Sequence, residues 1–494
     1  MLEGILTGLA TAFTLQNMLF LLLGCLVGTF IGMLPGLGPM TAIALMIPIA
    51  SVLPPATAII MMAAVYYGAI FGGSTSSILI NAPGVASTVP TSFDGFPMTQ
   101  QGFARRALKI AALASFAGGI IAAALLLLFT PILADLSLSF HSSDYFALMV
   151  LGLVSVAAFA SDGNLVRALV MTLLGLMLAT VGSDPAYGVP RFTLGVIDLV
   201  DGISFLLLVM ATFALAEALL AIMRSPPKTR TVNATEAVAS PPAIKPIAPV
   251  VARSSLVGFF IGLLPGAGAT VASFLAYTSE QRIAGATAQP RFGEGSAKGL
   301  AAPEAANNAA ATGSFVPLLT LGIPGSGTTA VLLGAFIAYG VTPGPMLLVT
   351  EPAVFWGVIV SMWLGNLVLL CLNLPLIPYI AKALQLPRQF LLPLILFFSL
   401  AGVYLVSFNP FDLKLMVLFA VSAVILRLFN FPMPPLILGF ILGGMLEENL
   451  HRALLLSDQS WSFIWQRPLT LGIMSLALLA LCFSIWQNSR SSIR

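Results

Sequence analysis

The chain has 494 residues, of which 59% are hydrophobic and only 8% are charged. An ordinary soluble domain carries about 25% charged residues, so this composition and a mean hydropathy of +1.03 exclude a soluble globular protein. The net charge of +3 is small, and the basic residues lie in loops beside apolar runs, which argues against a nucleic-acid-binding protein.

Long apolar runs follow one another from end to end of the chain. Each is near the roughly 20 residues that a helix needs to cross a membrane, and the runs lack strand alternation, so we predict an all-α polytopic membrane protein with about 10–13 transmembrane segments. In chain order we expect an interfacial segment (1–16), a first membrane half (17–223), a basic Pro-rich cytoplasmic linker (224–254), a second membrane half (255–467), and a C-terminal transmembrane helix with a short basic tail (468–494).

Two sequence motifs of the first half occur again in the second. The stretch "VGTFIGMLPGLGPMTAIAL" (27–45) aligns without gaps with "VGFFIGLLPGAGATVASFL" (257–275), 230 positions later. The stretch "GGSTSSILINAPGVASTV" (72–89) aligns with "GSFVPLLTLGIPGSGTTA" (313–330), 241 positions later. We therefore predict two homologous halves, each with two interrupted helices, and we favour an inverted relation between them.

The Pro-Gly-x-Gly tips of the first motif interrupt apolar helices. Non-helical backbone at membrane depth is tolerated where it lines a cavity, and the free N–H groups of a half-helix favour anions. The tip residues that we expect to bind substrate are Pro35, Gly36, Gly38, Pro265, Gly266 and Gly268. Close helix packing is the alternative for single glycines, since glycines also recur here at GxxxG spacing. Each tip belongs either to one broken crossing or to a re-entrant hairpin.

Hydroxyl and amide side chains flank the Pro-Gly breaks of the second motif. They supply donors for a carboxylate and are further predicted substrate-binding residues: Ser74, Thr75, Ser76, Ser77, Asn81, Ser326, Thr328 and Thr329. Any one of these Ser or Thr hydroxyls has the alternative of bonding to its own helix backbone.

A carboxylate lies in an Ala-rich span of the second half. Glu304, Asn307, Asn308 and Thr312 share one helix face by their spacing. Their oxygens suit Na⁺, and the carboxylate alone suits a proton, so we predict cation coupling here, mainly in the second half. The alternative is that Glu304 caps a helix at the membrane interface.

Several motifs together resemble those of one transporter family. They are "GMLPGLGP", "GLLPGAGA", "YYGAIFGGSTSSILINAPG", "FDGFPM" and "AAPEAANNAAATGSFVPLLTLGIPG". They are similar to the large membrane subunit of tripartite tricarboxylate transporters, the TctA family. The resemblance implies a multi-pass protein of the bacterial inner membrane that works with a small four-helix membrane subunit and a periplasmic solute-binding protein. It also makes Asp94 a candidate for gating, in what we expect to be a cytoplasmic turn.

Other chemistries find no support in the sequence. The stretch "GIPGSGTT" (322–329) lacks the lysine of a nucleotide-binding loop. No Ser–His or paired-Asp arrangement occurs inside the spans, and the three cysteines and two histidines are too scattered for a metal site. We therefore predict no enzyme and no cofactor beyond a coupling ion. The predicted function is carboxylate uptake by Na⁺ or H⁺ symport, with a passive organic-anion channel or facilitator as the alternative.

Overall fold

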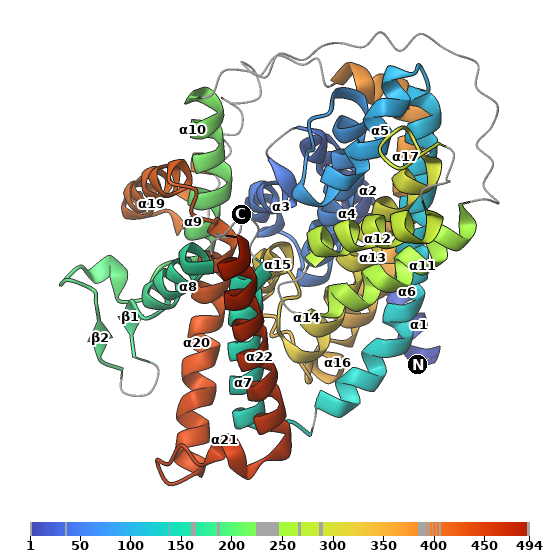
Figure 1. The fold of residues 1–494 in the computed structure, drawn as a ribbon. Coiled ribbons are helices and arrows are strands. Elements are labelled where there is room, and N and C mark those ends of the chain that lie inside the picture. The colour runs from blue at the N-terminus through green and yellow to red at the C-terminus, as the bar shows by residue number, and fades with distance from the viewer. Residues whose placement is uncertain are drawn as a thin grey trace.

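The structure is a computed structural model, and it describes residues 2–34, 37–137, 139–159, 165–184, 188–223, 247–264, 268–285, 290–383, 393, 396–397, 399–401, 403–404 and 407–491. Its regular elements are almost all helices (Figure 1), as a chain of apolar runs predicts.

The first part of the chain forms α1 (Leu2–Ala12), α2 (Leu15–Met33), α3 (Gly38–Ala50), α4 (Pro55–Ile80), η1 (Ala86–Thr88), α5 (Val89–Gln100), α6 (Ala104–Ser137), α7 (Ser142–Phe159) and α8 (Leu165–Ala179). Next come the antiparallel strands β1 (Gly182–Ser183) and β2 (Pro190–Arg191), η2 (Ile197–Leu199), α9 (Phe205–Val209), the π-helix η3 (Met210–Leu215) and α10 (Ala216–Met223). The remaining helices are α11 (Ala248–Leu263), α12 (Gly268–Ala284), α13 (Ala297–Gly313), α14 (Phe315–Leu321), α15 (Gly327–Ala338), α16 (Leu347–Thr350), α17 (Pro352–Ala383), α19 (Pro410–Leu428), α20 (Met433–Leu456), α21 (Phe463–Gln466) and α22 (Pro468–Ser491).

Five of the described helices are long and apolar enough to cross a membrane. They are α2, α4, α6 up to Ala134, the continuous run Phe205–Met223, and α17 up to Leu374, and seven shorter apolar helices accompany them. This confirms the all-α polytopic membrane fold, while the number of crossings stays a prediction. The interfacial role of 1–16 and the linker also stay predictions. Residues 224–246 lie outside the described residues, and α11 already begins at Ala248.

Small residues bring α2 directly against α4. A Cβ atom on Gly28 would overlap the carbonyl oxygen of Val65, and one on Gly32 would overlap that of Ala69. Glycines on one helix that meet the backbone of the next allow close approach, as in the GxxxG spacing. These two glycines therefore act in packing, which was the alternative reading of the glycine pattern.

The second half packs α11 against α13 in the same way. Cβ atoms on Gly258 and Gly262 would overlap the carbonyl oxygens of Ala306 and Ala310. The glycines follow Gly28 and Gly32 by 230 positions, and the alanines follow their counterparts by 241, which are the offsets of the two sequence motifs. This shared packing supports the interpretation of the halves as repeats, and their inverted relation stays a prediction.

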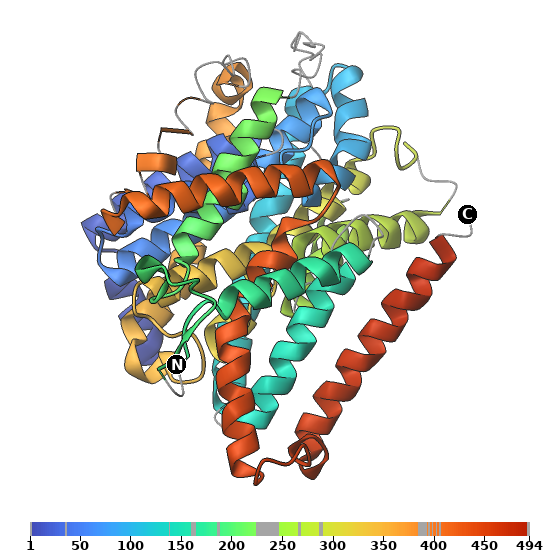
Figure 2. The same ribbon diagram turned by 90° about the vertical axis from the view of Figure 1, so that its left-hand side faces the viewer.

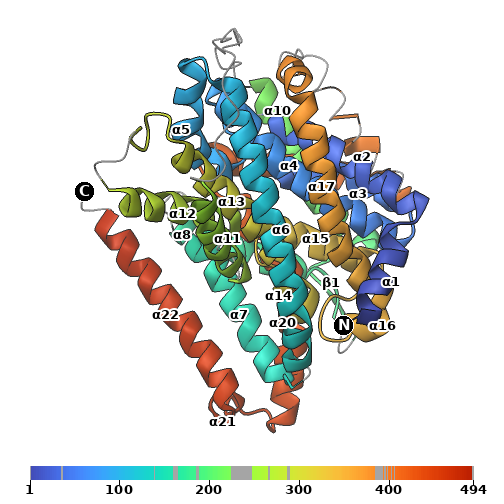
Figure 3. The same ribbon diagram turned by 90° about the vertical axis from the view of Figure 1, so that its right-hand side faces the viewer.

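The halves interleave around two buried helices, α4 and α13. Helix α6 of the first half contacts α13 of the second, and α17 contacts both α4 and α6 (Figure 3). A second group, α7, α8, α20 and α22, lies to one side of these helices (Figure 2). Helix α19 crosses η3 and α10 (Figure 2). At this crossing Arg427 pairs with Glu217 and donates a hydrogen bond to the carbonyl of Thr212.

Candidate functional site

Each helix tip lies beside the Pro-Gly break of its own half. A Cβ atom on Gly38 would lie 4.0 Å from a methyl group of Val85, and one on Gly268 would lie 3.3 Å from the Cβ of Ser326. The two contacts correspond, because Gly268 follows Gly38 by 230 positions and Ser326 follows Val85 by 241. The sequence motifs that suggested a site are therefore paired in space within each half.

The tip helices also reach the breaks of the opposite half. A Cβ atom on Gly327, at the start of α15, would lie 3.3 Å from the sulfur of Met40 in α3. Conversely, the hydroxyl of Ser273 in α12 donates a hydrogen bond of 2.7 Å to the carbonyl oxygen of Ser87 in η1. All four breaks thus meet in one region between the halves, as a shared binding site requires.

Both tip helices begin at a glycine, in a backbone conformation that only glycine adopts readily. Gly38 and Gly268 have φ values of +66° and +57°, in the left-handed region where a side chain adds strain. They begin α3 and α12, whose first N–H groups have no partner within the helix. The other predicted tip residues, Pro35, Gly36, Pro265 and Gly266, lie outside the described residues.

Several predicted hydroxyls of the first break serve their own helix. The Ser76 and Ser77 hydroxyls donate hydrogen bonds to the carbonyl of Gly73, and Ser77 also lies 2.8 Å from the Thr88 hydroxyl. Asn81 ends α4 with a φ of 51° and is exposed. The backbone-bonding alternative thus describes Ser76 and Ser77. Ser74 and Thr75 instead line a cavity beside Glu304, and the Ser74 hydroxyl is closer to Glu304 (2.7 Å) than to its own helix backbone (3.4 Å).

The second break begins with a helix cap. Ser326 and Thr329 form a reciprocal capping box at the start of α15, so their side chains satisfy backbone N–H groups locally. The hydroxyl of Tyr66 in α4 lies within hydrogen-bonding reach of Ser326 and Thr328. Tyr66 was not among the predicted site residues, because an aromatic residue in an apolar span is usually a packing residue.

Glu304 lies in the middle of α13 with none of its surface exposed. Its Oε2 accepts hydrogen bonds of 2.7 Å from Ser74 of α4 and 2.7 Å from Ser115 of α6. Its Oε1 accepts a hydrogen bond from the Thr91 hydroxyl of α5. The residue therefore does not cap a helix, and its depth in the membrane stays a prediction. Three hydroxyls of the first half complete a carboxylate site that the sequence predicted mainly for the second.

The other members of the predicted polar face divide into two kinds. Asn308 donates a hydrogen bond of 3.0 Å to the Glu304 carbonyl oxygen, within its own helix. Asn307 and Thr312 are also buried, yet both polar atoms of the Asn307 amide and the Thr312 hydroxyl lack a hydrogen-bond partner among the described residues. Buried polar groups are normally satisfied, so these two side chains are available to a bound water, ion or substrate.

Asp94 lies inside helix α5 and not in the turn that we expected. Its Oδ1 accepts hydrogen bonds from the backbone N–H groups of Gly293, Gly295 and Ser296, at 2.9, 2.9 and 2.6 Å. Its Oδ2 accepts one of 3.0 Å from the Tyr277 hydroxyl. Burial raises the pKa of the Asp94 carboxyl above its ordinary value, and the four hydrogen bonds oppose that rise. Asp94 thereby fastens α5 to the start of α13, the helix that carries Glu304.

Replacing Asp94 by Asn is expected to loosen this connection. The amide keeps the shape but loses the charge that strengthens four hydrogen bonds, at a cost of roughly 1–3 kcal/mol. We expect a lower midpoint of thermal unfolding in detergent and slower uptake in vesicles. Glu448→Gln, which alters a surface ion pair with Arg452, is the control. An Asp94→Asn protein with the stability and uptake rate of that control would show that the connection is dispensable.

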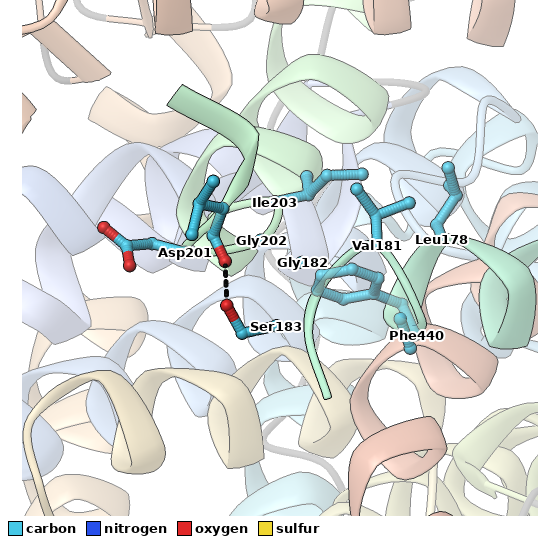
Figure 4. A pocket seen from close by; sticks show the side chains of 10 residues that line it. Leu178, Val181, Gly182, Ser183, Asp201, Gly202, Ile203 and Phe440 are labelled. Atoms are coloured by element: carbon cyan, nitrogen blue, oxygen red, sulfur yellow. Dashed lines mark hydrogen bonds between the residues drawn. The ribbon is translucent and has the colours of Figure 1, made fainter. Parts of the chain in front are cut away.

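Two larger hollows lie away from Glu304. One of about 310 Å³ lies between the end of α8, β1 and the residues before α9, with Ser183 and Asp201 on one side and Phe440 on the other (Figure 4). The other, about 430 Å³, is lined mainly by apolar side chains of α8, α9, α19 and α20. Neither is lined by Gly38 or Gly268, the tip residues that the structure describes. A carboxylate at the edge of the first hollow disfavours an anionic ligand.

Comparison with known protein families identifies the family to which this chain belongs. The family described as "Tripartite tricarboxylate transporter TctA family" matches residues 18–438, which include both tips, both breaks and Glu304. The chain belongs to the TctA family. Membership makes it a multi-pass membrane subunit of a transporter assembled from several components, which implies a transport role and not an enzymatic one.

Two relatives from Agrobacterium vitis extend the comparison. An "Uncharacterized 52.8 kDa protein in TAR-I ttuC' 3'region" is 40% identical over 485 residues, which are 98% of this chain and 96% of that protein. An "Uncharacterized protein in TAR-II ttuC' 3'region" is 42% identical over 234 residues, which are 47% of this chain and 96% of that protein. No solved structure matches this TctA chain.

Proposed function

We propose that this TctA chain takes up carboxylates by cation symport as the large membrane subunit of a binding-protein-dependent transporter. The observation that carries the proposal is the buried Glu304 carboxylate, whose described side-chain partners are three neutral hydroxyls. Among the ion pairs of the described residues, none involves Glu304. An unpaired carboxylate is costly in the interior, so a bound Na⁺ or proton would stabilise it.

Substrate charge gives a reason for coupling. The interior of the cell is negative, so the membrane potential opposes the entry of a carboxylate with two or three negative charges. The electrical work is about 2.3 kcal/mol per charge per 100 mV. Co-transported cations offset that cost. The starts of α3, α12 and α15 lie close to one another where the breaks meet, and helix N-termini favour anions, so this region is our proposed carboxylate site.

The proposed partners follow from membership of the family. A tripartite transporter needs two further components, which we propose are a small four-helix membrane subunit and a periplasmic solute-binding protein. The assembly would lie in the bacterial inner membrane, where the binding protein delivers the carboxylate to the outer face.

Uptake into proteoliposomes tests the proposal. The chain is reconstituted with its small subunit and binding protein, and labelled di- and tricarboxylates are added while Na⁺ and proton gradients are imposed separately. We expect accumulation above the external concentration under at least one gradient. Entry that only equilibrates and ignores both gradients would refute symport and identify the passive channel or facilitator.

A further inference from the structure

A small cavity borders Glu304 at the junction of four helices. Its volume is about 20 Å³, and its polar lining is Glu304 of α13, Ser74 and Thr75 of α4, Ser115 of α6 and Asn373 of α17. All five side chains are nearly or completely buried. A cavity needs about 10–15 Å³ to hold one water-sized particle, so this one has room for a single water molecule or ion.

Oxygen atoms dominate the polar part of this lining. Ser74 and Ser115 donate their hydroxyl hydrogens to Glu304, which leaves lone pairs on both hydroxyl oxygens. The Asn373 amide nitrogen is occupied by a hydrogen bond of 2.8 Å to the Leu369 carbonyl oxygen, so the amide oxygen is the free end of that side chain. Carboxylate, hydroxyl and amide oxygens are the ligands of hard cations.

The single negative charge that lines the cavity indicates the charge of the cation that it would bind. One carboxylate balances one positive charge, whereas Ca²⁺ sites typically use several carboxylates. The described residues hold no group of three or more His, Cys, Asp or Glu side chains that could bind a metal ion. A proton would need one oxygen of Glu304 and no cavity. Five side chains that bring oxygens to a space for one small particle therefore favour a monovalent metal ion.

We propose that Na⁺ binds in this cavity, with Glu304, Ser115 and Asn373 from three different helices among its ligands and the Ser74 and Thr75 hydroxyls completing the set. This inference rests on the proposed symport and names its ion. The ion joins α4 and α6 of the first half to α13 and α17 of the second. Ser115 and Asn373 were absent from the residues that the sequence singled out.

Thermal unfolding of the purified chain in detergent tests Na⁺ binding directly. At constant ionic strength, NaCl replaces choline chloride in steps, and a ligand that binds only the folded state raises the unfolding midpoint in a saturable way. We expect such a rise with Na⁺, and we expect Asn373→Ala to weaken the apparent affinity at least about tenfold, which corresponds to about 1.4 kcal/mol. Ser115→Ala is the second variant, should Asn373→Ala fail to fold.

Asn366 provides a matched control on the same helix. It is buried like Asn373 and donates the same type of hydrogen bond, 2.9 Å to the Met362 carbonyl oxygen, but it packs against Gly119 and does not line the cavity. Asn366→Ala should keep the Na⁺ response. An equal rise with KCl, no rise with Na⁺, or equal weakening by both Asn variants would overturn the Na⁺ site. Proton-driven accumulation without a Na⁺ response would overturn this inference alone, whereas uptake that ignores every gradient would overturn the proposed symport as well.

Discussion

Gradient-driven accumulation is expected to fall below about a tenth of the wild-type rate when Glu304 is replaced by Gln. Loss of the carboxylate weakens cation binding, and a binding free energy weaker by about 1.4 kcal/mol corresponds to a tenfold lower affinity. Glutamine keeps the size of the side chain but removes its charge. The three hydroxyls that donate to Glu304 can rotate to accept from the new amide, at a cost of about 1–3 kcal/mol if one is left unsatisfied. The variant should therefore fold while its cation dependence disappears.

A matched substitution separates this effect from general loss of charge. Glu280 is also buried, but it forms an ion pair of 2.8 Å with Arg253, so its charge is already compensated. Glu280→Gln should lose some stability and retain the dependence of uptake on the gradient. If Glu304→Gln accumulates substrate under the same gradient as the wild type, Glu304 is not the coupling residue.

Valine at Gly32 is expected to prevent the chain from folding into an assembled transporter. Its Cβ would overlap the carbonyl oxygen of Ala69, which is helix backbone and cannot rotate away. Over-packing usually costs about 1–3 kcal/mol, and an overlap with backbone belongs at or above the upper end. The measurement is the yield of monodisperse protein in mild detergent, together with its midpoint of thermal unfolding.

The corresponding glycine of the second half, Gly262, provides a second and independent test of this prediction. Gly262 meets the carbonyl oxygen of Ala310 as Gly32 meets that of Ala69, so Gly262→Val should cause a loss of similar size. Gly444→Val in α20 is the control, because a Cβ atom there has no neighbour within 4 Å among the described residues. A well-folded Gly32→Val or Gly262→Val protein would refute the close approach of these helices.

Sequence patterns predicted those features of the site that are local. The apolar runs predict helices, and the repeated Pro-Gly-x-Gly motif predicts where Gly38 and Gly268 begin a new helix after a break. Glu304 stands out because a carboxylate in an Ala-rich span needs a partner. These signals depend only on neighbours in the chain, so no tertiary contact is needed to read them.

The partners of Glu304 could not be predicted in the same way. Thr91 and Ser115 are separated from it by 213 and 189 positions, and a lone Ser or Thr in an apolar helix has no distinctive pattern. Asp94 was expected in a turn because basic residues follow it, yet it lies in a helix that packs on the start of α13. Such contacts arise only when the halves interleave, which sequence spacing does not specify.

Simultaneous measurement of cation and carboxylate entry tests the central claim most directly. Proteoliposomes that contain the three components are loaded with a cation-sensitive dye, and entry of labelled carboxylate is followed in the same preparation. The account predicts a fixed ratio of cations to carboxylate in the wild type and loss of cation entry in Glu304→Gln. Carboxylate entry without cation entry in the wild type, or an unchanged ratio in Glu304→Gln, would contradict it.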